Sequence, residues 1–169
     1  DYALLPDDGK IHEIIDGDHY MSPAPGTYHQ TVSRRIQFQL YEQIELPELG
    51  VVFDAPTDVQ LSEFDIVQPD LLVIPREAQQ RVSPSRILGA PDLVVEILSE
   101  HSAGRDRGLK LSAYERTGVR EYWIVDTQRQ TVERYVREGD RLQKTGSHSK
   151  RIEYDTGEIH AVVDLTKVW

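Results

Sequence analysis

The stretch PDLVVEILSE at residues 91–100 sets one carboxylate inside a run of strand-forming apolar residues. Three aliphatic residues precede Glu96 and two follow it. A glutamate is almost never fully buried unless it is paired or binds a metal. Glu96 therefore either faces water from the edge of a sheet or lies on a strand that presents it to a partner.

A second apolar run, PDLLVI at residues 69–74, supplies a candidate partner. Asp92 lies four residues from Glu96, about 13 Å away on a strand that rises ~3.3 Å per residue, so these two cannot share one ion. If the two runs pair in antiparallel fashion about a centre at Ser83-Pro84, Asp70 lies opposite Glu96. Directly opposed Cβ atoms are about 4.5–5.5 Å apart, which brings both carboxylates within reach of one cation.

Two opposed carboxylates repel each other unless a cation or a proton lies between them. Oxygen ligands at this spacing suit Mg²⁺ or Mn²⁺, which keep several waters and bridge to phosphate groups. The alternative is a structural ion pair between Glu96 and an arginine, Arg105 or Arg107, with no metal. The spacing leaves both alternatives open.

A hydrolytic site also needs a cation near the attacking water. Leu98 occupies the strand position that would otherwise carry a lysine, so the strand supplies none. Lys110, on the helix that follows, is the candidate if Leu109 and Ala113 mark the buried side of that helix. The alternative is an ion pair between Asp106 and Lys110 on a solvated helix face.

The remaining pattern predicts one α+β domain over residues 1–169, with a mixed sheet, a long N-terminal helix and a second helix after the Glu96 strand. Apolar residues at a four-residue step predict the long helix from Thr27 to about Leu46, and the second helix spans about 104–117. Asp16-Gly17 and Gly139-Asp140 predict hairpins. The expected strands are 51–53, 57–61, 67–74, 93–98, 121–126, 131–136, 141–145 and a last one near 158–163, with a polar connection over 76–90.

Composition narrows the class of protein. Apolar runs are too short to span a membrane, cysteine is absent, and no secretory leader is evident, so we expect a cytoplasmic protein without thiolate chemistry. A net charge of −10 disfavours a nucleic-acid partner. The charge is uneven, because residues 1–75 hold 3 basic and 14 acidic side chains, whereas residues 76–169 hold 16 and 15.

Several separated motifs carry a family resemblance. The motifs are ALLPDDGKIHEIIDG (3–17), MSPAPGTYHQ (21–30), VQPDLLVI (67–74), APDLVVEILS (90–99), RDRGLKLSAYERTGVREYWIVD (105–126) and VDLTKVW (163–169). In this order they resemble the Uma-two (Uma2) family of restriction-endonuclease-like proteins, within the PD-(D/E)XK nuclease superfamily. In that family the lysine of the motif has moved from the strand to the next helix, which agrees with Leu98 and Lys110.

The resemblance implies a role for each matching residue. Asp70, Glu96 and the Ile97 backbone carbonyl would bind the metal, and Lys110 would position or activate the water and stabilise the transition state. Glu13 matches an early acidic residue that could add a water-mediated ligand, or it is a solvated strand residue. The implied substrate contacts are His29, Arg105, Arg107 and Tyr114, with Tyr114 packed beside the lysine.

The resulting hypothesis is a Mg²⁺- or Mn²⁺-dependent endonuclease that cuts nucleic acid, DNA rather than RNA. We expect a homodimer, because cutting both strands needs two sites and a dimer would gather the scattered arginines around one groove. The alternative is a non-catalytic nucleic-acid-binding or regulatory module that retains the fold.

Overall fold

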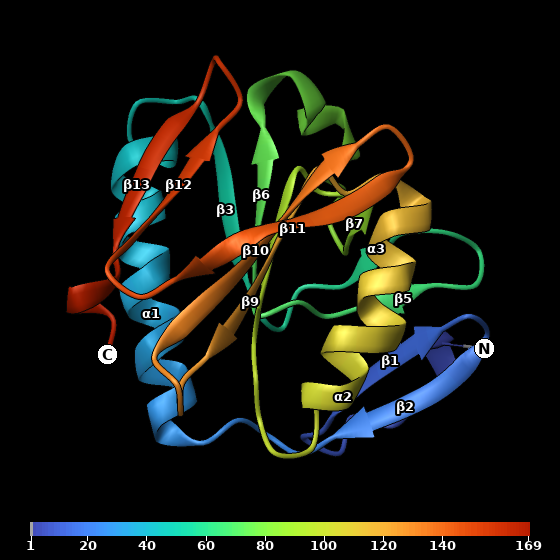
Figure 1. The fold of residues 1–169 in the computed structure, drawn as a ribbon. Coiled ribbons are helices and arrows are strands. Elements are labelled where there is room, and N and C mark those ends of the chain that lie inside the picture. The colour runs from blue at the N-terminus through green and yellow to red at the C-terminus, as the bar shows by residue number, and fades with distance from the viewer. Residues whose placement is uncertain (1) are drawn as a thin grey trace.

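A six-stranded mixed sheet lies at the centre of the fold, in the order β11-β10-β9-β8-β6-β3 (Figure 1). β8 pairs in antiparallel fashion with β6 and in parallel with β9. The computed structural model describes residues 2–169. The strands of this sheet are β3 (Gly50–Asp54), β6 (Leu71–Pro75), β8 (Leu93–Ile97), β9 (Glu121–Asp126), β10 (Thr131–Glu138) and β11 (Arg141–His148).

The central sheet is covered on both faces, so β6 and β8 are apolar except for Glu96. Successive residues of a strand point to opposite faces. Leu71 and Val73 belong to one hydrophobic core, whereas Leu72 and Val94 belong to the other. Glu96 alternates with Val95 and therefore points to the same face as Val94, into a layer that is mostly apolar.

α1 (Thr27–Leu40) covers one face, together with the hairpin of β12 (Arg151–Asp155) and β13 (His160–Asp164) (Figure 1). Its residues at the four-residue step are buried, as predicted, and the helix continues as the π-helix η2 (Tyr41–Glu45). The Gln43 side chain donates a 2.8 Å hydrogen bond to the backbone of Val162, which ties the helix to β13. Within residues 2–169, no helix combines the length and apolar composition needed to cross a membrane.

The second helical segment covers the other face. It consists of α2 (Ala103–Arg105), the π-helix η4 (Asp106–Lys110) and α3 (Leu111–Thr117). Gly118 ends it in the left-handed region, at φ 97°, where glycine carries no steric penalty. Asp106, Lys110, Ala113 and Tyr114 form its buried side, so the strand residue Glu96 and the helix residue Lys110 face each other.

A second sheet, in the order β2-β1-β5-β4-β7, lies beside α2 and α3. Its first two strands form the hairpin predicted at Asp16-Gly17, where both residues have positive φ. The strands are β1 (Ile11–Ile15), β2 (Asp18–Ser22), β4 (Val59–Gln60), β5 (Ile66–Val67) and β7 (Ile87–Leu88).

The structure corrects several predicted boundaries. The expected strand 67–74 is two strands, β5 and β6, which belong to different sheets and are separated by Gln68, Pro69 and Asp70. The connection over 76–90 contains the 3-10 helix η3 (Arg76–Arg81) and β7. β12 was not predicted, and two further 3-10 turns lie at η1 (Tyr2–Leu4) and η5 (Leu165–Lys167).

Candidate active site

Asp70 and Glu96 meet where β6 begins and β8 ends. Leu71 pairs with Val95, so the next positions outward in this antiparallel register are Asp70 and Glu96, as the sequence predicts. Asp70 Oδ2 accepts a 2.7 Å hydrogen bond from the Ile97 backbone N–H. The short segment 68–70 between β5 and β6 therefore places Asp70 against β8, the strand that carries Glu96.

Glu96 is buried, and one of its carboxylate oxygens accepts hydrogen bonds from two side chains. Its Oε1 atom accepts hydrogen bonds from Lys110 Nζ at 2.8 Å and from the Tyr114 hydroxyl at 2.6 Å. Burial raises the pKa of Glu96 well above its ordinary value, and the positive charge of Lys110 only partly opposes this. A second positive charge beside this carboxylate would oppose the effect of burial further.

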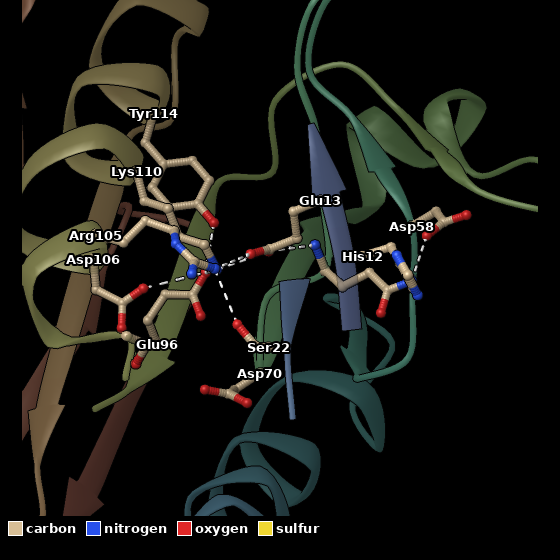
Figure 2. Close-up of polar contacts among 12 residues, drawn as sticks. His12, Glu13, Ser22, Asp58, Asp70, Glu96, Arg105, Asp106, Lys110 and Tyr114 are labelled. Carbon is tan, nitrogen blue, oxygen red and sulfur yellow. Dashed lines mark hydrogen bonds and ion pairs between the residues drawn. The ribbon is translucent and has the colours of Figure 1, made fainter. Parts of the chain in front are cut away.

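Lys110 lies among three carboxylates (Figure 2). Its Nζ atom is 2.8 Å from Glu13 Oε1, 2.8 Å from Glu96 Oε1 and 3.8 Å from Asp106 Oδ1. Burial lowers the pKa of Lys110, but the three carboxylates outweigh burial and raise the pKa above its ordinary value. The lysine is therefore a stable cation within the site.

The helix face that carries Lys110 differs from the predicted one. Leu109, expected to mark the buried side, is 42% exposed, whereas Lys110 is only 4% exposed. Lys110 lies three and four residues before the buried Ala113 and Tyr114, and Asp106 lies four before Lys110, so these residues share the buried face. The solvated Asp106–Lys110 pair considered above is wrong, since both side chains are buried.

Glu13 is a buried member of the same cluster and not a solvated strand residue. Its Oε1 atom accepts a hydrogen bond from the Gln68 backbone N–H at 3.0 Å and lies 2.8 Å from Lys110 Nζ. Its Oε2 atom lies 3.5 Å from Arg105. Both oxygens of Glu13 are thus engaged by protein groups, which disfavours the water-mediated metal ligand that the resemblance implies.

The two arginines lie apart from Glu96. Arg105 donates a 3.0 Å hydrogen bond to the Ser22 hydroxyl and lies over the Tyr20 ring, so it joins β2 to the helix (Figure 2). Arg107 pairs with Glu133 at 2.9 Å. The alternative in which an arginine neutralises Glu96 is therefore wrong.

His29 and Tyr114 support the two carboxylates. His29, in the first turn of α1, lies with Nε2 3.2 Å from Asp70 Oδ2. Burial lowers the pKa of His29, but the Asp70 carboxylate outweighs it and raises the pKa. Tyr114 is fully buried and is not part of the cavity wall, so the predicted substrate contact by Tyr114 is wrong, and its hydroxyl instead holds Glu96.

A cavity of about 1040 Å³ opens onto these residues. Its wall includes all the predicted site residues except Tyr114: Glu13, His29, Asp70, Glu96, Ile97, Arg105, Arg107 and Lys110. Asp106 also lines the cavity, and sequence reasoning missed its place in the site. The available signal was the four-residue spacing between Asp106 and Lys110, which indicates one shared face but not which side of the helix is buried.

The donor set fits a hard cation that keeps much of its water. Among residues 2–169, the Asp70 side chain accepts its hydrogen bonds through Oδ2 and the Glu96 side chain accepts its hydrogen bonds through Oε1. Asp70 Oδ1 and Glu96 Oε2 accept none and could therefore act as metal ligands. The same residues contain no cluster of three or more acidic or histidine side chains arranged as a complete metal cage. Mg²⁺ is commonly bound by one or two carboxylates plus water and substrate phosphate, so two carboxylates and a backbone carbonyl suit it.

Comparison with known proteins identifies a family and a fold. The family described as "Uma2: Putative restriction endonuclease" matches residues 1–153. No curated protein matches the chain. Among solved structures, a "putative nuclease belonging to DUF820" from Anabaena variabilis superposes with a TM-score of 0.80 and 18% sequence identity, over 99% of this chain and 94% of that one. The fold is therefore that of the Anabaena protein.

Proposed function

Because the chain belongs to the Uma2 family of restriction-endonuclease-like proteins, we propose that it is a metal-dependent endonuclease that hydrolyses phosphodiester bonds in DNA. The observation that carries the proposal is the meeting of Asp70 and Glu96 beside Lys110 at one cavity. Two acidic ligands and a cation are the groups that metal-assisted phosphodiester hydrolysis requires.

Asp70 Oδ1, Glu96 Oε2 and the Ile97 carbonyl would hold the cation. The chemistry that a bound Mg²⁺ or Mn²⁺ supplies is Lewis-acid activation of water and of the phosphodiester. His29 and the Ile97 N–H fix Asp70 Oδ2, so the carboxylate of this cavity-lining residue has a defined orientation. Ligands fixed in this way need no reorganisation when the cation binds.

Lys110 would stabilise the negative charge that develops on the phosphate in the transition state. The surrounding carboxylates raise its pKa, so the ammonium keeps its proton at neutral pH. It therefore acts as a hydrogen-bond donor and a fixed charge, and not as the base that deprotonates water. His29, Arg105 and Arg107 line the same cavity, and we assign them contacts to the flanking phosphates.

A non-catalytic nucleic-acid-binding module is the second candidate. The observation in its favour is that Lys110 donates to both Glu13 and Glu96, an arrangement that could be purely structural. The net charge of −10 weighs against extended contact with a phosphate backbone, so this module would also need a local groove.

A homodimer would place two cavities together, and we include dimerisation and a cytoplasmic location in the proposal.

Nicking of supercoiled plasmid with Mg²⁺ or Mn²⁺ tests the catalytic proposal. We expect Lys110→Met to lower the nicking rate by about 10²–10³-fold, the range for loss of one transition-state donor. Lys144→Met is the matched control, because Lys144 is exposed and, among residues 2–169, forms an ion pair with Glu133 alone. Plasmid binding without nicking would favour the binding module, and equal rates for wild type and Lys110→Met would contradict the role of Lys110.

A further inference from the structure

Asp106 contains an unpartnered buried oxygen that points into the proposed active site. The residue is 1% exposed and lines the cavity, and its Oδ1 atom has no hydrogen-bond partner within residues 2–169. A buried carboxylate oxygen without a hydrogen bond destabilises the folded state. A feature that destabilises the fold and faces a cavity points to function and not to stability.

The nearest cation to this oxygen is the ammonium of Lys110, at 3.8 Å. An ammonium group has three N–H donors. Two carboxylate oxygens lie 2.8 Å from Lys110 Nζ and occupy two of these donors. They are Oε1 of Glu13, on β1, and Oε1 of Glu96, on β8. Asp106 Oδ1 lies on the remaining side, one π turn before the lysine on the same helix (Figure 2).

We propose that Asp106 is a positioning residue for Lys110. Together with Glu13, its carboxylate holds the Lys110 ammonium beside Glu96, in the place where a phosphate oxygen would develop charge. The four-residue spacing within the turn over 106–110 sets both side chains on the cavity side of the helix. This inference rests on the proposed nuclease function.

A purely structural role for Asp106 predicts a different outcome from a positioning role. Asp106 adds a third negative charge to a buried cluster with one ammonium, and burial raises its pKa. Removing that charge at constant shape relieves carboxylate repulsion, so Asp106→Asn should leave the melting temperature unchanged or raise it. A residue that held the helix in place would instead lower it.

The test compares wild type with Asp106→Asn, Asp106→Glu and the control Leu109→Ala, which changes an exposed residue of the same turn. Plasmid nicking with Mn²⁺ gives kcat and KM. We expect Asp106→Asn to lower kcat about 10-fold or more with KM changed less than about 2-fold, the pattern of a group that acts in the transition state. Asp106→Glu keeps the carboxylate and should recover part of kcat, while Leu109→Ala should match wild type.

A second measurement does not depend on activity. Each protein is treated with an amine-acylating reagent, and modification of each lysine is followed by mass spectrometry, with Lys144 and Lys167 as exposed references. Lys110 should be protected in wild type and Leu109→Ala and should react faster in folded Asp106→Asn. If no protein cuts nucleic acid, the nuclease proposal fails, and Lys110 reactivity still tests the positioning claim.

Unchanged Lys110 protection in Asp106→Asn would overturn the inference, and so would an unchanged kcat. A lower melting temperature with Lys110 still protected would show that Asp106 is structural. If Asp106→Asn does not fold, that result also overturns the inference, because the inference requires the uncharged variant to be at least as stable as wild type.

Discussion

The Asp70 carboxylate accepts a 2.7 Å hydrogen bond from the backbone N–H of Ile97, the residue that follows Glu96. This bond fixes the aspartate of one strand against the glutamate of its neighbour. The two carboxylates thus meet through the sheet register, and within residues 2–169 one oxygen of each accepts no hydrogen bond. The geometry of the proposed metal site therefore depends on Glu96 within β8 and on Asp70 directly before β6.

Metal binding should stabilise the folded protein, and Glu96→Gln should abolish this effect. A ligand at about 100 times its Kd stabilises the native state by about 2.7 kcal/mol. Millimolar Mn²⁺ should therefore raise the melting temperature of wild type measurably. The substituted amide has no charge to offer the ion, so the shift should vanish in Glu96→Gln. The metal-free variant should be as stable as wild type or more so, because burial of the Glu96 charge is unfavourable.

Thermal denaturation with and without Mn²⁺, monitored by fluorescence or circular dichroism, measures both effects. Glu133→Gln is a suitable control, since Glu133 is an acidic residue at the cavity that pairs with Arg107. It should retain the Mn²⁺ shift. An equal Mn²⁺ shift in wild type and Glu96→Gln would count against Glu96 as a ligand.

His29→Gln should weaken metal binding without preventing it. His29 Nε2 lies 3.2 Å from Asp70 Oδ2, so the imidazole orients the proposed ligand without touching the ion. Loss of such a supporting contact typically lowers metal affinity by about 10–100-fold. Mn²⁺ titration followed by calorimetry gives the Kd, and His160→Gln, on an exposed histidine of β13, should bind as wild type does. Wild-type affinity in His29→Gln would remove His29 from the site.

Most helices and hairpins of the fold could be predicted, because the spacing of apolar residues and the turn residues are properties of short stretches of sequence. The four-residue apolar step placed α1, and Asp16-Gly17 placed the β1–β2 hairpin. The error at residues 67–74 has a different origin, since continuous apolar character cannot show that a strand changes sheets. β12 was missed because its alternation, with only Ile152 and Tyr154 buried, is too short to stand out from its polar surroundings.

The candidate site was predictable in its strand residues and less so in its helix residues. An antiparallel register follows from arithmetic, which is why Asp70 and Glu96 could be paired before the structure was known. Which face of the second helical segment is buried depends on packing against the sheet, and the spacing between Asp106 and Lys110 does not contain that information. The separate engagements of Arg105 and Arg107 depend on Glu13 and Glu133, each distant in sequence.

Tyr114→Phe should lower stability with only a modest loss of activity. Its hydroxyl donates a 2.6 Å hydrogen bond to Glu96 Oε1 within a fully buried region. Loss of a hydrogen bond to a charged group typically costs about 1.5–3 kcal/mol. Lys110 still donates to the same oxygen, so Glu96 keeps its position and its role as a ligand. Urea denaturation measures the stability change, and a plasmid-nicking rate reduced as strongly as in Lys110→Met would contradict a purely supporting role.

Acid should weaken the link between the helical segment η4 and β10, because the ion pair between Arg107 and Glu133 joins them. Burial raises the pKa of Glu133, but Arg107 outweighs it, and the pKa in the folded state lies below its ordinary value. A group with a lowered pKa contributes stability above its unfolded pKa and loses that contribution as the pH falls through the folded pKa. Wild type should therefore lose stability on acidification more steeply than Glu133→Gln, which has no such proton to take up.

The expected size of this effect is small, since Arg107 is partly exposed and solvent screens the pair. Ion pairs of this kind contribute about 0.2–1 kcal/mol. The difference in unfolding free energy between wild type and Glu133→Gln, measured in urea at neutral pH and again below the ordinary pKa of a glutamate, should shrink by about that amount. A difference that stays constant across the acidic range would mean that Glu133 titrates alike in the folded and unfolded states, and that its pair with Arg107 adds nothing to stability.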